Sequence, residues 1–170
     1  MNPTGPTAAL LTAATLVLTG CTAVSGDEEP LPEVTVLEFG NTRPVDLSTL
    51  RGPLVINLWG SYCGPCRREM PILQDFHEQH GDEVEVVGID YQDPLEDEAR
   101  QLVEDTGVTY RLLSDVDGEV NSADPFPNIM GLPFIALVDE DGNVAHMEYG
   151  EVQSIGELES LVDEHLGVDL

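Results

Sequence analysis

Residues 53–80 read PLVINLWGSYCGPCRREMPILQDFHEQH, and this stretch decides the fold. Its first seven residues, 53–59, are a nearly continuous apolar run, which is typical of a strand buried on both faces of a sheet. From Cys66 to His80 the apolar residues recur at the spacing of one helix face, and a glycine then ends the pattern. The chain therefore passes from a buried strand into a helix, and the cysteine pair formed by Cys63 and Cys66 lies at the junction.

The rest of the chain alternates between strand and helix patterns. These patterns predict strands at 33–39, 84–90 and 109–115, turns with a short extended piece at 40–52, helices at 93–106 and 154–166, a weak helical turn at 118–131 and a hairpin at 134–150. Because helices separate the first strands, those strands are expected to pair in parallel, whereas the closing hairpin adds an antiparallel edge. The sequence therefore predicts an α/β fold: a central mixed sheet flanked by helices, with a short N-terminal β extension.

Acidic residues far outnumber basic ones. There are 33 Asp and Glu residues against 6 basic residues, all of them arginine, and the formal net charge is -27. Such a charge repels nucleic-acid phosphates and anionic lipid headgroups, so we expect no nucleic-acid partner. A length of 170 residues suits one domain with a single core.

The N-terminus carries an export pattern. Residues 1–20 hold no charge and contain the run AALLTAATLVL, which is too short for a permanent membrane span. The run ends at LTGC, which resembles the bacterial lipobox, in which the cysteine, here Cys21, is lipidated. We therefore predict a lipoprotein signal peptide at 1–20, an acidic tether at 21–32 and the folded domain at 33–170. No Lys or Arg precedes Arg43, which departs from the usual signal pattern and leaves a disordered N-terminus with an incidental cysteine as the alternative.

The spacing of Cys63 and Cys66 also begins many zinc sites. A helix rises ~1.5 Å per residue, so His77 would lie roughly 16 Å along the axis from Cys66, whereas zinc ligands sit about 2 Å from the ion. The two remaining histidines away from this helix, His146 and His165, are interpreted as solvated surface residues. We therefore expect no metal.

A purely structural disulfide also explains the cysteine pair poorly. A crosslink between cysteines so close in sequence closes a tiny loop and removes little entropy from the unfolded chain. A redox dithiol explains the neighbours better. At the start of a helix, the sulfur of Cys63 faces free N–H groups that favour its thiolate, and Cys66, one turn further, is placed to resolve a mixed disulfide. Gly64 and Pro65 let the turn close and remove one competing donor.

The motif WGSYCGPCRREMP resembles the active site of the thioredoxin superfamily, and within it the TlpA/ResA-like membrane-anchored thiol-disulfide oxidoreductases. MGLPFIALVDEDGNV is similar to the family's cis-proline loop and last hairpin, and the resemblance spans residues 33–168. It implies a thioredoxin-like fold. It also implies that Pro133 is a cis-proline facing the dithiol, with the Leu132 backbone able to pair with a bound peptide. Pro71 would kink the helix, and Trp59 would either pack beside the dithiol or serve as a core aromatic.

Three positions depart from or qualify that pattern. Asn57 stands where thioredoxin has a buried aspartate, so a proton relay must come from elsewhere. Asp93 lies where the ResA-like group often has a glutamate near the cysteines, but it also fits a helix N-cap, which we favour. Phe134 replaces the threonine that usually follows the cis-proline, and is expected to reshape the substrate groove.

The resemblance implies an extracytoplasmic, lipid-anchored thiol-disulfide oxidoreductase that works without a cofactor as a reductant of disulfides in exported proteins. Its electrons would come from a membrane thiol transporter of the CcdA/DsbD type, and apocytochrome c is one candidate client. The alternative is a copper- or haem-handling lipoprotein that uses the dithiol as a soft ligand. A peroxiredoxin-type peroxidase is disfavoured because the GSYCGPC context lacks the threonine and proline of that family.

Overall fold

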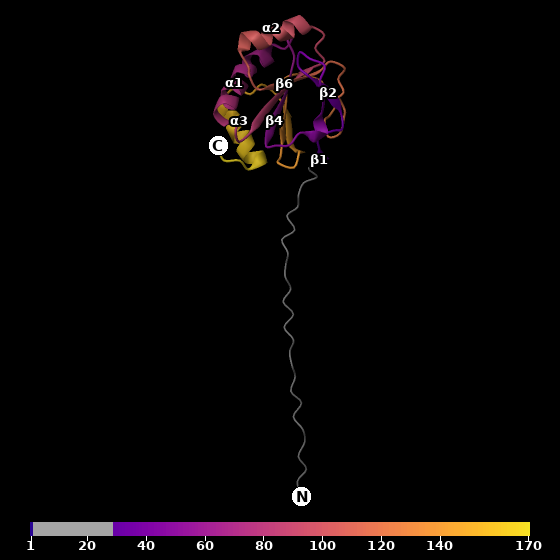
Figure 1. Cartoon of the computed structure of the whole chain (residues 1–170). Coiled ribbons are helices and arrows are strands. Elements are labelled where there is room, and N and C mark those ends of the chain that lie inside the picture. The colour runs from indigo at the N-terminus through magenta and orange to yellow at the C-terminus, as the bar shows by residue number, and fades with distance from the viewer. Residues whose placement is uncertain (2–28) are drawn as a thin grey trace.

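The computed structural model describes Met1 and residues 29–170. These residues form one eight-stranded sheet with the order β1-β8-β7-β4-β5-β6-β2-β3 (Figure 1). The strands are β1 (Glu29–Pro30), β2 (Thr35–Glu38), β3 (Pro44–Asp46), β4 (Leu54–Trp59), β5 (Glu85–Tyr91), β6 (Arg111–Asp115), β7 (Phe134–Val138) and β8 (Asn143–Tyr149). The helices are α1 (Gly64–His80), α2 (Glu96–Thr106) and α3 (Ile155–Leu166), and a short 3-10 turn, η1, covers Leu47–Thr49.

The centre of the sheet is mixed, which confirms the predicted fold class. Strand β4 pairs in parallel with β5, and β5 pairs in parallel with β6. On its other side β4 pairs antiparallel with β7, which continues into the antiparallel hairpin with β8. All six residues of β4 are buried, as expected for a central strand with both faces covered.

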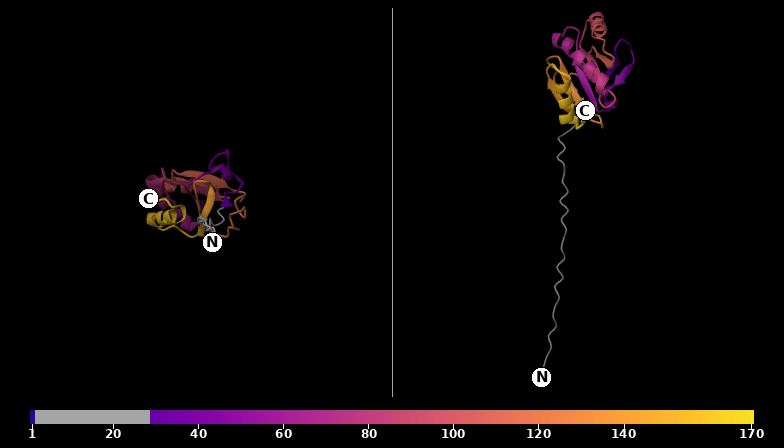
Figure 2. Two further views of the ribbon diagram at one scale, coloured as in Figure 1. Left: turned by 90° about the horizontal axis from the view of Figure 1, so that it is seen from below. Right: turned by 90° about the vertical axis from the view of Figure 1, so that its left-hand side faces the viewer.

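The two faces of the sheet are covered differently. Helices α1, α2 and α3 supply the core on one face, and α1 lies between the other two when the molecule is seen from that side (Figure 2). The opposite face is covered by Leu47 of η1 and by Val120, Phe126 and Ile129 from the connection between β6 and β7. The weak helical turn predicted at 118–131 is a series of turns, because its prolines lack the N–H donors that a helix needs.

The sheet begins earlier in the chain than the predicted domain start at residue 33. Glu29 and Pro30 form β1, which pairs with Val144 and Asn143 at the start of β8, and Leu31 is buried in the core. The predicted signal peptide and Cys21 lie outside the described residues. Among residues 29–170, no helix combines the length and apolarity needed to cross a bilayer.

Candidate active site

Cys63 and Cys66 are joined by a disulfide at the start of α1. The S–S distance is 1.98 Å and the Cα atoms are 5.3 Å apart. Cys63 is the N-cap residue of α1, and its sulfur accepts the backbone N–H of Cys66 at 3.2 Å. Cys63 retains 7% of its surface exposed, whereas Cys66 is fully buried. The outer sulfur thus faces the positive end of the helix, which stabilises a thiolate there when the disulfide opens.

The loop before Cys63, residues 60–62, is held by a side chain of α1, and we call it the active-site loop. The guanidinium of Arg67 donates from Nε and Nη2 to the carbonyl of Ser61, at 3.2 and 2.9 Å. Arg68 lies on the exposed side of α1 and pairs instead with Glu151. Arg67 therefore fixes the conformation of the active-site loop, while Arg68 connects α1 to the segment that follows β8.

The segment of Leu132 and Pro133 lies at the same end of the sheet as the disulfide. Phe134, the first residue of β7, pairs with Leu58 of β4, so the residues before it lie beside the point where the active-site loop leaves β4. The Leu132–Pro133 peptide bond is cis. Leu132 packs against the core cluster that contains both cysteines. Among the hydrogen bonds of residues 29–170, none engages the backbone N–H or C=O of Leu132.

Two aromatic positions serve the core. Trp59 is fully buried in the cluster that holds both cysteines, and its ring packs against Phe39 with centroids 5.8 Å apart. Phe134 is 1% exposed and packs edge-on against Tyr149, with Phe126 on its other side. The expectation that Phe134 reshapes a substrate groove is therefore wrong, because its side chain fills the opposite core cluster.

Asp93 does not cap α2, contrary to our expectation. The helix begins at Glu96, and its N-cap residue is Leu95, which makes no side-chain cap bond. Asp93 is buried, and its Oδ2 accepts the backbone N–H of Ser61 in the active-site loop, while Oδ1 accepts the N–H of Leu95 at 2.9 Å. One carboxylate therefore ties the loop before Cys63 to the segment that leads into α2.

A buried glutamate in α1 was not predicted as a site residue from the sequence. Glu69 is fully buried; its Oε2 accepts from Nδ2 of Asn57 at 2.8 Å and its Oε1 accepts the N–H of Val152 at 2.9 Å. Burial raises the pKa of Glu69 to about 7, against the lowering effect of these two hydrogen bonds. The signal was present in the sequence, because Glu69 stands between Cys66 and Leu73 on the apolar face of the helix.

The histidines lie apart from the cysteines. His146 of β8 and His165 of α3 stack with ring centroids 3.8 Å apart and are partly buried, so they are surface residues that are only partly solvated. His77 packs edge-on against Tyr110. Within the described part of the chain, no group of three or more His, Cys, Asp or Glu side chains is arranged to hold a metal ion.

Comparison with known proteins agrees with this arrangement. The model of the Redoxin family matches residues 26–163. The chain belongs to the Redoxin family. A similar protein is the thiol-disulfide oxidoreductase ResA of Halalkalibacterium halodurans, 29% identical over 133 residues that cover 77% of this chain and 70% of that protein. A second ResA, from Bacillus subtilis, is 25% identical over 135 residues, which cover 78% of this chain and 70% of the relative.

Solved structures place the Redoxin domain in the same group. A thio-disulfide isomerase from Thermus thermophilus superimposes with a TM-score of 0.65 at 27% identity, covering 86% of this chain and 100% of that one. The fold is shared with a putative thiol:disulfide interchange protein DsbE from Chlorobium tepidum, with a TM-score of 0.66, 21% identity and coverage of 81% and 93%. This Redoxin protein is thus a TlpA/ResA-like thiol-disulfide oxidoreductase of the thioredoxin superfamily.

Proposed function

We propose that this oxidoreductase reduces disulfides of exported proteins outside the cytoplasm, with Cys63 as the nucleophile and Cys66 as the resolving thiol. The observation that carries the proposal is the position of the Cys63 sulfur at the N-terminus of α1, where it accepts the N–H of Cys66. The helix end stabilises the Cys63 thiolate. Because Cys66 is fully buried, it reacts only with a sulfur that Cys63 has already brought to the site.

The exchange moves two electrons from the protein to its client. The Cys63 thiolate attacks one sulfur of the client disulfide, a mixed disulfide forms, and the client's other sulfur leaves as a thiolate that takes up a proton. Cys66 then loses its proton and attacks the Cys63 sulfur. The Cys63–Cys66 disulfide forms, and the second client sulfur departs as a thiolate that is protonated in turn.

The second step needs an acceptor for the Cys66 proton, and we assign Glu69 to this role. Glu69 follows Cys66 by three positions in α1, so the two side chains are neighbours on one helix face. Its pKa of about 7 suits a group that gains and loses a proton near neutrality. Asn57 cannot take up the proton itself, and acts by positioning the carboxylate through its hydrogen bond.

We assign the client's backbone to the segment at Leu132 and Pro133. The backbone N–H and C=O of Leu132 make no hydrogen bond among residues 29–170, and its side chain packs against the cluster that holds both cysteines. An extended peptide can pair with these backbone groups as an added strand. This contact recognises polypeptide without reading its sequence.

The reduction potential of the Cys63–Cys66 couple and the trapping of clients by Cys66→Ser test the proposal together. We expect a potential below that of glutathione, and mixed disulfides between Cys63 and exported proteins. Cys63→Ser is the control and should trap nothing. Two results together would instead identify a disulfide-forming enzyme: a potential well above that of glutathione, and client proteins that lack their disulfides in a strain without this protein. Stoichiometric Cu(I) binding without reductase turnover would support the metal-handling alternative.

We further propose that Cys21 carries a lipid, that a CcdA/DsbD-type membrane protein returns the electrons and that apocytochrome c is among the clients. The LTGC motif and the likeness to ResA proteins support these assignments. Cys21→Ser should release the protein from membranes and leave dithiol exchange in solution intact. Retention of the variant in the membrane fraction would contradict lipidation. Accumulation of oxidised apocytochrome c in a deletion strain would support that client.

A further inference from the structure

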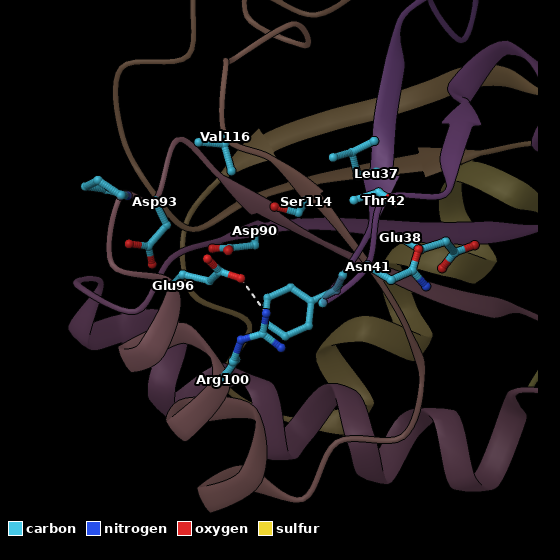
Figure 3. A pocket seen from close by; sticks show the side chains of 13 residues that line it. Leu37, Glu38, Asn41, Thr42, Asp90, Asp93, Glu96, Arg100, Ser114 and Val116 are labelled. Atoms are coloured by element: carbon cyan, nitrogen blue, oxygen red, sulfur yellow. Dashed lines mark hydrogen bonds and ion pairs between the residues drawn. The ribbon is translucent and has the colours of Figure 1, made fainter.

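A cavity of about 480 Å³ lies between the β2–β3 hairpin, the ends of β5 and β6 and the start of α2 (Figure 3). We call it the acidic pocket. Its polar wall includes Asp90, Asp93 and Glu96, and Figure 3 shows these three side chains along the cavity, with Ser114 beside Asp90 on the neighbouring strand β6. Apolar side chains, among them Leu37 and Val116, form its rim, and both are substantially exposed.

The charges of the acidic pocket are only partly compensated. Arg100 pairs with Glu96, and the other carboxylate of the wall, Glu38, pairs with Arg111 at 2.8 Å. Among residues 29–170, neither Asp90 nor Asp93 forms an ion pair. The pocket therefore presents two acidic groups that the described chain leaves without a cation.

Asp90 points to a ligand most directly. It is 3% exposed, and its Oδ1 has no hydrogen-bond partner in the described part of the chain. A buried polar atom without a partner costs folding free energy, so such an atom commonly marks a site where another molecule donates. Burial, and then the charge of Asp93, raise the pKa of Asp90 to about 8. A donor with a positive charge would satisfy both carboxyl groups.

The acidic pocket is connected to the dithiol through two backbone relationships. Asp93 accepts the N–H of Ser61, two residues before Cys63. Asp90 is the parallel pairing partner of Trp59, the residue at which β4 ends and the active-site loop begins. Strand β5 lies about 4.8 Å from β4, on the side opposite β7. The pocket therefore opens at the same end of the sheet as the disulfide, and Leu132 lies on the other side of β4. A polypeptide bound at the disulfide can place a neighbouring side chain there.

The chemistry of the pocket selects the ligand. A metal ion is disfavoured because no three His, Cys, Asp or Glu side chains of residues 29–170 are arranged around a common point. An apolar rim above the two carboxyl groups of Asp90 and Asp93 instead fits a side chain with a long aliphatic stem and a cationic head. We propose that the acidic pocket binds a lysine or arginine side chain of the client, close in sequence to the cysteine that Cys63 attacks. This inference rests on the proposed reductase function.

Reduction of designed peptides by the wild-type chain tests the inference. Each peptide carries the same disulfide and one variable residue, which is lysine or its uncharged analogue norleucine, moved through the positions on either side of the cysteine. We expect one position at which lysine raises kcat/KM about tenfold, mainly through a lower KM. A tenfold effect is the lower end of what a hydrogen bond to a charged group contributes. Equal kcat/KM for both residues at every position would overturn the inference.

Two variants separate the pocket from the overall negative charge. Asp90→Asn should reduce the ratio of kcat/KM between the lysine and norleucine peptides to about one. Asp97→Asn makes the same carboxyl-to-amide change at an exposed position of α2 outside the pocket, and should keep the wild-type ratio. Loss of the ratio in both variants would assign it to long-range attraction and overturn the inference. Failure to reduce any peptide would overturn the proposed function itself, and the pocket assignment with it.

A measurement on the wild-type chain covers the case in which Asp90→Asn does not fold. Titration with N-acetyl-lysine methylamide, followed by NMR, should shift the amide signals of Asp90, Ser114 and Thr42, which line the pocket. The norleucine analogue should leave them unchanged. Shifts confined to residues elsewhere on the acidic surface would contradict the assignment.

Discussion

The side-chain amide of Asn57 donates to the carboxylate of Glu69 at 2.8 Å, in the fully buried space between β4 and α1. A second donor, the backbone N–H of Val152, holds the other oxygen of the same carboxylate. Donors on both oxygens stabilise the charged form, while burial disfavours it more strongly. The balance is a carboxyl group with a pKa of about 7 that reaches one turn along α1 from the resolving cysteine.

Replacement of Glu69 by Gln should slow disulfide reduction at neutral pH by about a hundredfold, the lower end for loss of a general base. The wild-type rate should rise with pH through an inflection near 7, because the ionised carboxylate accepts the Cys66 proton, and the variant should lack that inflection. The pH dependence of single-turnover peptide reduction measures both effects. Glu104→Gln, on the exposed side of α2, is the matched control. An unchanged inflection in Glu69→Gln would assign it to another group.

The two buried carboxyl groups also predict how stability depends on pH. Their folded-state pKa values, about 7 for Glu69 and about 8 for Asp90, exceed the ordinary values of 4.5 and 3.8. The folded state therefore holds these protons more tightly than the unfolded state, and their contribution to stability is complete below pH 4 and lost as pH rises through 7 and 8. We expect the free energy of unfolding to fall by at least about 1 kcal/mol between pH 5 and 8.

Urea denaturation of the oxidised protein across that pH range provides the measurement. Glu69→Gln and Asp90→Asn should each flatten the profile, because an amide does not titrate there. Asp97→Asn should preserve the wild-type slope. A free energy of unfolding that rises from pH 5 to 8 would show that other groups dominate.

The adjacent arginines of α1 should differ in their contribution to stability. Arg67 donates two hydrogen bonds to the Ser61 carbonyl, whereas Arg68 forms an exposed ion pair with Glu151. We expect Arg67→Ala to destabilise the protein by about 1–2 kcal/mol, because a buried carbonyl loses a charged donor. Arg68→Ala should cost less than about 1 kcal/mol, as exposed ion pairs do. Thermal unfolding of both variants compares the effects directly, and equal losses would contradict this assignment.

The reduced protein should contain one acidic thiol. The Cys63 sulfur lies at the helix N-terminus and Cys66 is buried, so the Cys63 thiol is expected to have a pKa below the ordinary ~8.5 and Cys66 a higher one. The rate of alkylation of Cys63 in Cys66→Ala, measured against pH, gives the first value. The same measurement on Cys66 in Cys63→Ala is the counterpart. A pKa of Cys63 above that of Cys66 would reverse their proposed roles.

Local patterns were sufficient for the elements that carry the dithiol. The apolar run of β4 and the helical spacing that follows it required only the sequence around Cys63, because burial on both faces and a helix face leave periodic signatures. The parallel pairing of β4 with β5 followed from the helix between them. The start of the helix predicted at 154–166 is equally local, because Ser154 caps α3 by accepting the N–H of Glu157 at 3.2 Å.

Contacts between distant segments could not be read in this way. Asp93 has the sequence context of a helix cap, but its carboxylate is taken by Ser61, far away in the chain. Asp90 becomes a pocket residue only because β2 and α2 fold around it. Likewise, β1 has no strand pattern of its own and exists through its pairing with β8. Each of these depends on a partner that no local pattern specifies.

The position of β1 has a consequence for access to the dithiol. It pairs with Asn143 and Val144, and Val144 in turn lies beside Val138, which pairs with Leu54 at the start of β4. The disulfide follows the other end of β4, after Trp59. The described chain thus enters the domain at the pole opposite its reactive sulfurs. In a domain held by its N-terminus, those sulfurs would lie at the end farthest from the point of attachment. A client and an electron donor would then bind one after the other at the same exposed end.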